Sequence, residues 1–434
     1  MTILTKIQNH FNFKKLGSTW KIEILAGLST FLSLSYIFVV NPAILSEAGI
    51  NKSIVFFATV IVSSLATIIM GLWANKPFAL APGLEMNAYI SFVVVGTLGF
   101  VWQDALGMVF WSGILMLVLN FLQIRKHIIK AIPNKLKSGL AASVGVFLML
   151  IALKVSGILA YEGIQIQGLG LLASPEALVF YVGLIVALIL RHFKIKGAIL
   201  ISIVIASVIA HLLGIGSSIE PINISKEMLG GTFAFNLGII FNPKVFSVII
   251  ILFVIDFYGS IAKFIGLTRN TTIIDESGNM PKMKEALTID GGATVLGAIL
   301  GTSNVTTYVE SAVGIGEGGR TGLTAIVSGI LMLFFLLLTP LINLVPVVAT
   351  TGTLLFVGLT LLPARDELNT DHWTDVIAIA IMIITTILTF GLDKAMLAGF
   401  GSFIILQVAQ GEWKSINPYL LGSTILLLIS ILLT

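Results

Sequence analysis

The chain has 434 residues, of which 57% are hydrophobic and only 11% are charged. Soluble domains carry about 25% charged residues, so this composition excludes a soluble protein and indicates a polytopic membrane protein. The absence of cysteine excludes disulfides, thiol catalysis and metal sites built from cysteine. The net charge of +4 reflects lysine and arginine in cytoplasmic loops, so it predicts no nucleic-acid partner.

Residues 1–23 are basic and lack the apolar core and cleavage site of a signal peptide, so we expect a cytoplasmic lead-in. Apolar runs predict an all-α fold of membrane-spanning helices. They fall at about 24–41, 54–74, 87–98, 105–122, 138–155, 177–191, 197–213, 245–266, 288–301, 310–316, 321–339, 346–362, 374–391 and 395–409. We expect Asn41-Pro42 to end the first helix. A last run, 420–433, is short for a crossing of about 20 residues and fits either a tilted or a re-entrant helix.

Basic residues predict the orientation of these helices. They gather in the loops 123–137 and 191–196 and recur at Arg269, Arg320 and Arg365. All of these basic residues fall on the same side of the membrane if the third run and its polar lead-in together cross it once. Because cytoplasmic loops are enriched in lysine and arginine, we expect a multi-pass protein of the cell membrane with a cytoplasmic N-terminus.

Two segments interrupt this series of helices. In 75–89, Pro77 and Pro82 cannot lie inside a regular helix, so we expect extended chain before Asn87. In 301–320, a run of β-branched and polar residues precedes a short apolar piece that begins near Glu310. Irregular backbone at membrane depth persists only where it packs inside protein or lines a cavity.

The two interrupted segments take matching places in the two halves of the chain. Matched broken segments are typical of transporters with inverted repeats and a binding site at the midplane. We expect repeats over 24–213 and 245–409, an extracellular linker over 214–244 and a C-terminal segment over 410–434. Half-helices starting near Glu85–Asn87 and near Glu310 would turn their free N–H groups toward a ligand between them.

Charged residues inside the apolar runs are the remaining candidates. Asp256 and Lys263 share one helical face with Gly259 and Ser260 in the eighth run. That face must turn toward a cavity or the bundle interior, although Asp256 could also form a structural hydrogen bond and Lys263 could extend to the membrane surface. Glu85 could pair with Lys263 or contact a ligand.

Four stretches resemble the nucleobase–ascorbate transporter family, in particular its hypoxanthine/adenine/guanine permeases. These stretches are 27–45, 81–89, 253–266 and 300–325. The resemblance implies fourteen helices in two inverted sevens, and a core domain that moves against a gate domain in an elevator-like way. It also implies a purine base as substrate and a proton or, less often, sodium as the coupling cation, and it is compatible with a homodimer.

The resemblance also implies which residues contact the substrate. Its third and tenth elements contribute Asn87, Ala88, Thr307, Tyr308, Val309 and Glu310, with Glu310 binding the base by hydrogen bonds. The chain departs from the family pattern at three further positions. Glu85 replaces a glycine, Gly259 replaces the second acid of the eighth helix, and Lys263 replaces a threonine.

We therefore expect Glu85 and Lys263 to form a compensating pair that changes either the coupling ion or the substrate. Two other functions stay open at this point. One is a carrier of small anions, which Lys263 would favour. The other is an intramembrane enzyme using Asp256 and Glu310 as acid and base, although the sequence contains no known motif for such chemistry. We expect no metal and no cofactor.

Overall fold

The computed structural model describes residue 8 and residues 10–122, 134–162, 165–216, 228–268, 271–275, 280–338, 344–363, 373–413 and 416–433. The basic loop residues at 123–133, Arg269 and Arg365 lie outside these ranges, as do residues 1–7 of the lead-in.

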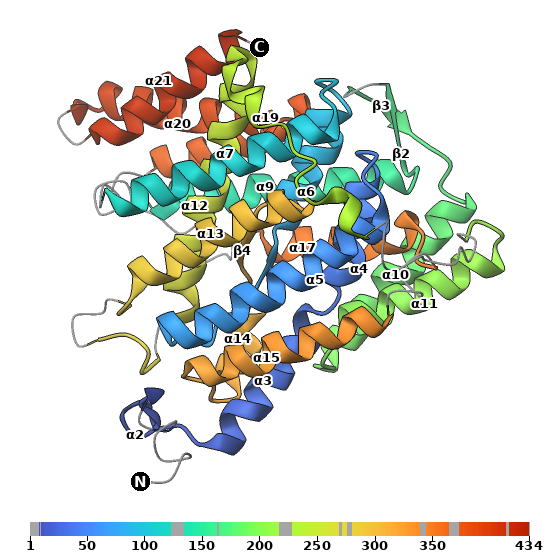
Figure 1. Ribbon diagram of the computed structural model, residues 1–434. Coiled ribbons are helices and arrows are strands. Elements are labelled where there is room, and N and C mark those ends of the chain that lie inside the picture. The colour runs from blue at the N-terminus through green and yellow to red at the C-terminus, as the bar shows by residue number, and fades with distance from the viewer. Residues whose placement is uncertain are drawn as a thin grey trace.

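Figure 1 shows a predominantly helical molecule in which the two halves of the chain interleave. The elements of the first half are α2 (Phe13–Leu16), α3 (Trp20–Leu34), α4 (Ile37–Ser46), α5 (Lys52–Ile69), η1 (Met70–Ala74), β1 (Leu80–Pro82), α6 (Leu84–Ala88), η2 (Tyr89–Val95), α7 (Trp102–Phe121), α9 (Asn134–Val155), β2 (Leu159–Glu162), β3 (Gln165–Leu169), α10 (Pro175–His192) and α11 (Ala198–Leu212). Short 3-10 turns follow: η3 (Met228–Gly231), η4 (Leu237–Phe241) and η5 (Pro243–Val245).

The second half repeats this order. Its elements are α12 (Phe246–Thr268), α13 (Met283–Leu300), β4 (Val305–Thr307), α14 (Ser311–Gly316), α15 (Gly322–Leu333), η6 (Phe334–Leu338), η7 (Val347–Thr350), α17 (Thr351–Thr360), α19 (Trp373–Thr389), α20 (Leu392–Ala409) and α21 (Pro418–Leu433). Among the described residues, six helices are long and apolar enough to cross a membrane, and shorter apolar helices match most of the other predicted runs. The predicted runs 288–301 and 310–316 correspond to α13 and α14.

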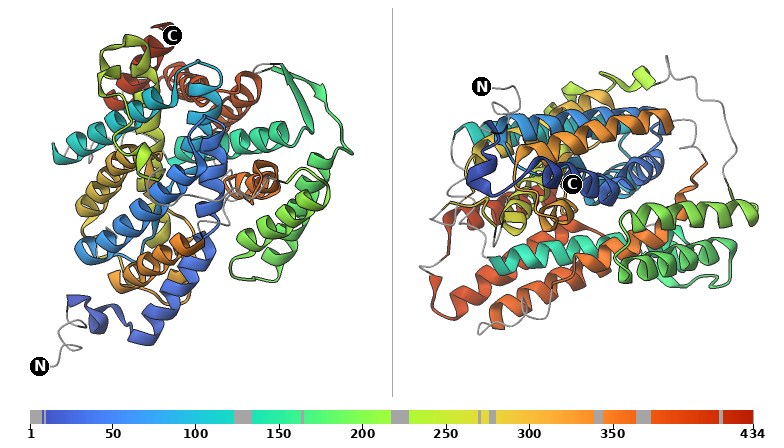
Figure 2. Two further views of the ribbon diagram at one scale, coloured as in Figure 1. Left: turned by 45° about the vertical axis from the view of Figure 1, so that its right-hand side comes forward. Right: turned by 90° about the horizontal axis from the view of Figure 1, so that it is seen from below.

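The helices form two packing groups. The core group consists of α3–α7 and α12–α15, where α7 packs on α13 and where α15 packs on α3 and α5. The gate group consists of α9–α11 and α17–α20, where α9 packs on α17 and α19 and where α10 packs on α11. The view from below in Figure 2 shows these groups as two layers. Each group therefore draws helices from both halves of the chain.

Polar side chains at helix starts explain where several helices begin. Asn51, Ser174 and Thr321 each accept a hydrogen bond from a backbone N–H in the first turn of α5, α10 and α15, at 2.8, 3.1 and 3.2 Å. Glu23, fully buried in α3, adds a second cap to α15, because it accepts from the backbone N–H of Arg320 at 3.0 Å and of Thr321 at 3.2 Å. These bonds tie α3 to the start of α15.

The prediction that Asn41-Pro42 ends the first helix is wrong. The first span covers Trp20–Ser46, with its interruption earlier, between α3 and α4, and with Pro42 inside α4. The Asn41 side chain donates to the hydroxyl groups of Thr59 at 2.5 Å and Thr302 at 2.9 Å. These bonds hold the chain next to Pro42, whose missing N–H leaves the helix one hydrogen bond short.

The two interrupted segments pair with each other. β1 and β4 form an antiparallel two-stranded sheet in which Leu80 faces Thr307, Ala81 faces Thr306 and Pro82 faces Val305. The backbone groups released by the breaks are therefore satisfied inside the protein, as membrane depth requires. This confirms the prediction of a short extended piece before each half-helix.

One hairpin and one helix lie outside the repeat pattern. β2 and β3 form a hairpin that the sequence did not indicate. The run at 420–433 forms α21, which packs on α20 and α12. Ile431, near the end of α21, lines the same cavity as Lys394 at the start of α20. The two helices are therefore antiparallel.

Candidate functional site

The site forms where the two half-helices begin. α6 starts two residues after β1, and α14 starts four residues after β4, so the strand pair brings both helix starts together. The first backbone N–H groups of any helix lack partners within that helix. They also carry the positive end of the helix dipole. The arrangement confirms the predicted half-helices near Glu85–Asn87 and Glu310. It favours a ligand acceptor at the start of α6, because the first N–H groups of α14 already bond the carbonyls of residues 308–310.

Glu310 is the carboxylate at this junction and is the N-cap residue of α14. Its Oε1 accepts a hydrogen bond from the Tyr36 hydroxyl at 2.6 Å. Its Oε2 is buried and has no hydrogen-bond partner among the described residues. Buried carboxylate oxygens nearly always have a partner in native proteins. The free Oε2 is therefore a candidate acceptor for a ligand N–H.

Three of the predicted contact residues lie next to Glu310. Tyr308 is buried, and its hydroxyl donates to the backbone carbonyl of Pro82 at 2.5 Å. Thr307 is fully buried, and its hydroxyl donates to a carboxylate oxygen of α13 at 3.1 Å. The side chains of both residues therefore hold the junction together. Val309 is 46% exposed.

The contact residues predicted on α6 are both buried. Asn87 and Ala88 have no exposed surface. The Ser303 hydroxyl donates to Asn87 Oδ1, whereas Asn87 Nδ2 has no partner among the described residues. The junction thus has one unpaired amide donor on the α6 side and one unpaired carboxylate acceptor on the α14 side.

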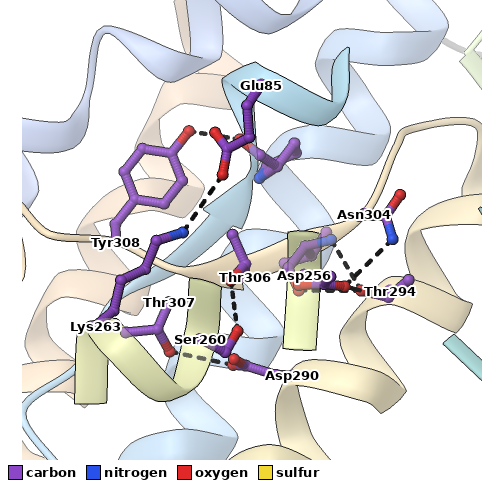
Figure 3. Close-up of polar contacts among 12 residues, drawn as sticks. Glu85, Asp256, Ser260, Lys263, Asp290, Thr294, Asn304, Thr306, Thr307 and Tyr308 are labelled. Atoms are coloured by element: carbon purple, nitrogen blue, oxygen red, sulfur yellow. Dashed lines mark hydrogen bonds and ion pairs between the residues drawn. The ribbon is translucent and has the colours of Figure 1, made fainter. Parts of the chain in front are cut away.

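The predicted pair of Glu85 and Lys263 is confirmed. Lys263 Nζ lies 3.6 Å from Glu85 Oε1, with side-chain exposures of 18% and 16%. Figure 3 shows the two side chains pointing toward one another, from α12 and from α6, close to Tyr308. Four residues before Lys263, a Cβ added to Gly259 would meet no described atom within 4 Å. The position where the family carries an acid is therefore open space here.

Asp256 has the structural contacts that were left open as an alternative. Its Oδ2 accepts hydrogen bonds from Thr294 Oγ1 at 2.9 Å and from Asn304 Nδ2 at 3.2 Å. These bonds join α12, α13 and the chain before β4, and they lie apart from the Glu85–Lys263 pair in Figure 3. Asp256 Oδ1 has no partner among the described residues. A role of Asp256 in coupling stays a prediction.

The sequence reasoning missed two residues of this region. Asp290 on α13 is fully buried, accepts the bond from Thr307 and leaves Oδ2 without a described partner. A single carboxylate inside the apolar run 288–301 could have indicated it. Tyr36 had no such signal, because one tyrosine in a first apolar helix is common. Within the described ranges, no three His, Cys, Asp or Glu side chains gather as a metal site.

Comparison with known proteins shows the family of this chain. The family model described as the permease family, which bears the name of the xanthine/uracil permeases, matches residues 21–398. The chain belongs to this nucleobase–ascorbate transporter family. The members of the family are permeases and not enzymes, so the intramembrane-enzyme alternative is excluded.

Relatives in this permease family match the chain almost end to end. A putative permease, MJ0326, of Methanocaldococcus jannaschii is 36% identical and covers 96% of this chain and 95% of its own length. The adenine permease AdeQ of Escherichia coli is 34% identical, over 94% of this chain and 92% of its own. The guanine/hypoxanthine permease PbuO of Bacillus subtilis is 31% identical, over 97% of this chain and 99% of its own length.

Solved structures share the fold of this permease at low identity. The transmembrane domain of the cyanobacterial bicarbonate transporter BicA is 15% identical, with a TM-score of 0.63 over 90% of this chain and 97% of that one. Murine Solute Carrier 26 family member A9, an anion transporter, is 12% identical, with a TM-score of 0.67 over 90% of this chain and 69% of that one. These likenesses confirm the predicted fold of about fourteen membrane segments in an inverted repeat.

Proposed function

We propose that this permease takes up a purine nucleobase by secondary active transport and binds it between the starts of α6 and α14. The observation that carries the proposal is the free, buried Oε2 of Glu310 beside two helix N-termini. A purine is flat and has ring N–H donors and ring nitrogen acceptors along its edge. A carboxylate acceptor and backbone N–H donors on facing elements complement that edge. Relatives named as adenine and guanine/hypoxanthine permeases support the same class of substrate.

The residues of the site have distinct roles in this proposal. Glu310 accepts a ring N–H, the backbone N–H of Val309 donates to a ring nitrogen, and Ala88 lines the site. Asn87 Nδ2 is a further free donor. Thr307 and Tyr308 shape the site through the bonds that their hydroxyl groups make to the neighbouring elements.

We propose that a proton moves with the purine. A carboxylate is costly inside the apolar layer unless a cation or a proton cancels its charge. Glu310 lies at the binding site, and Asp256 and Asp290 lie close by with one free oxygen each among the described residues. A proton taken up by one of these groups would let the loaded site cross the membrane without net negative charge.

An elevator-like movement of the core group against the gate group fits this arrangement. The whole binding site lies on elements of the core group, so it can move as one unit. A cavity of about 240 Å³ lies between the two groups, lined by Tyr89 and Val93 of η2 and by Phe390 and Lys394 near the start of α20. At another place the Lys196 ammonium, from the α10–α11 loop, pairs with Glu317 at the end of α14 at 2.8 Å.

The test is uptake of radiolabelled purines by proteoliposomes with and without an inward proton gradient. We expect gradient-dependent uptake that falls at least tenfold in Glu310→Gln, because the amide replaces one acceptor oxygen by a donor. Glu317→Gln, at the exposed end of the same half-helix, is the matched control and should retain uptake. Absence of purine uptake by the wild type, or full uptake by Glu310→Gln, would refute the proposal.

A second candidate function is transport of a small inorganic or organic anion. The observation that favours it is Lys263, an ammonium group beside the helix starts. Uptake of radiolabelled bicarbonate, sulfate and formate by the same proteoliposomes provides the comparison. Anion uptake that purines do not inhibit would favour this candidate over the nucleobase.

A further inference from the structure

The Glu85–Lys263 pair differs from the other charged groups of the core group in its surroundings. Asp256 and Asp290 are 2% and 0% exposed and receive hydrogen bonds from neighbouring side chains. Glu85 and Lys263 keep 16% and 18% of their side-chain surface. The helical turn before Lys263 holds the open space at Gly259. The pair therefore borders a space that a ligand could enter, whereas the two aspartates are packed inside protein.

The Lys263 ammonium has N–H donors that no described acceptor pairs. An ammonium group has three N–H donors and no acceptor. The contact with Glu85, at 3.6 Å, is longer than the 2.7–2.9 Å of a charge-assisted hydrogen bond. Lys263 has no further hydrogen bond or ion pair among the described residues. At least two of its donors are therefore available for an acceptor atom of a ligand.

Lys263 also lies near the acceptor that binds the ligand. In Figure 3 the Glu85–Lys263 pair lies close to Tyr308, which is two residues before Glu310. The site thus presents an obligate donor, Lys263, and an acceptor, Glu310 Oε2, to one bound molecule. A ligand edge that complements both must place an acceptor beside an N–H donor. On the edge that carries position 6, the 6-oxo group and N1–H of hypoxanthine and guanine have this order, whereas the 6-amino group and N1 of adenine have the reverse. The N3 and N9–H edge is common to these bases, so the discrimination requires that the position 6 edge faces Lys263 and Glu310.

We propose that Lys263 is a specificity-determining residue that makes this permease select 6-oxopurines over adenine, with Glu85 holding the ammonium in place. The proposal rests on the proposed function and names the substrate class within it. A bound adenine would turn its amino group toward an ammonium that can only donate. Leaving such buried donors unpaired costs enough to disfavour the wrong base by roughly 10- to 100-fold.

Competition experiments with purified protein in proteoliposomes test this inference. Uptake of radiolabelled hypoxanthine is measured against unlabelled hypoxanthine, adenine and unsubstituted purine, which differ in the group at position 6 and in whether N1 carries a hydrogen. In the wild type we expect hypoxanthine to compete at least about tenfold better than adenine, with purine between them. Lys263→Arg should keep this order, because arginine is also a donor without an acceptor.

Variants without the charge of Lys263 test whether the loss of selectivity comes from the lost ammonium or from a folding defect. Lys263→Met leaves Glu85 without its partner, so the double variant Lys263→Met with Glu85→Gln is measured as well. In whichever of these variants folds, the hypoxanthine-to-adenine ratio should fall to within about threefold of unity. Lys21→Met, which makes the same chemical change on an exposed face of α3, is the control and should keep the wild-type ratio.

The possible results distinguish failure of the Lys263 selectivity proposal from failure of the proposed purine transport. Wild-type protein that takes up purines without preferring hypoxanthine overturns the inference and leaves the proposed function standing. The same holds if the preference survives in the double neutral variant. Wild-type protein that binds no purine overturns the proposed function, and the inference with it.

Discussion

The hydrogen bond from Tyr36 to Glu310 gives the most direct test of how the site is built. Tyr36 is 2% exposed and its hydroxyl lies 2.6 Å from Glu310 Oε1. In Tyr36→Phe the ring is kept and only this donor is lost. Glu310 would then have both carboxylate oxygens without a described side-chain partner, because Oε2 already has none. A carboxylate in that state adopts another rotamer or takes in water, and either change weakens the hydrogen bond that we expect between Oε2 and the purine.

The expected loss of purine affinity in Tyr36→Phe follows from the type of hydrogen bond that is removed. Hydrogen bonds to charged groups contribute about 1.5–3 kcal/mol. Each 1.4 kcal/mol corresponds to a factor of ten in an equilibrium constant, so we expect Tyr36→Phe to weaken purine binding by roughly 10- to 150-fold. The dissociation constant can be measured by calorimetry or from the ligand-induced rise in melting temperature of the purified protein.

Tyr181→Phe is a suitable control for this experiment. Tyr181 is half-buried on α10 in the gate group, and its ring packs at an angle to Phe180. Loss of its hydroxyl group should leave purine affinity unchanged. If Tyr36→Phe binds purine within about twofold of the wild type, Tyr36 does not position Glu310 and the description of the site is wrong.

Two further predictions concern packing and movement. A Cβ on Gly322 would lie 1.9 Å from the backbone oxygen of Gly71, whereas one on Gly292 would meet no described atom within 4 Å. Gly322→Ala should therefore lower the unfolding free energy by about 1–3 kcal/mol and Gly292→Ala should preserve or raise it, as read from melting temperatures; equal melting temperatures would contradict the close contact. Because the chain has no cysteine, Lys196→Cys and Glu317→Cys can be joined by a cleavable thiol reagent. Cross-linking should stop uptake and cleavage should restore it, while each single cysteine variant should be unaffected; normal uptake by fully cross-linked protein would argue against movement of the core group relative to the gate group.

Local features of the sequence were sufficient to predict the class of fold. Hydropathy predicts membrane spans because the bilayer imposes one length and one polarity on every crossing. Pro77 and Pro82 indicate broken helix because proline lacks the backbone donor that a helix interior requires. Lys263 and Glu85 could be paired from sequence because both depart from one family pattern in segments already expected to meet.

The partners within the site depended on tertiary structure. Tyr36 and Glu310 are 274 residues apart, and no local pattern relates them. The same holds for Thr307 with Asp290, whose bond requires β4 to lie against α13. The interruption of the first span was misplaced for a related reason, since the contacts of Asn41 with Thr59 and Thr302 exist only in the folded core group.

The sequence alone therefore determined that the chain crosses the membrane many times, where two crossings are broken and which charges lie within them. These properties depend on backbone chemistry and on the cost of transferring each residue into lipid, both of which are local. Only the tertiary structure decided which oxygen of Glu310 is left free and which donor holds the other. That choice depends on directional hydrogen bonds between helices that the fold brings together.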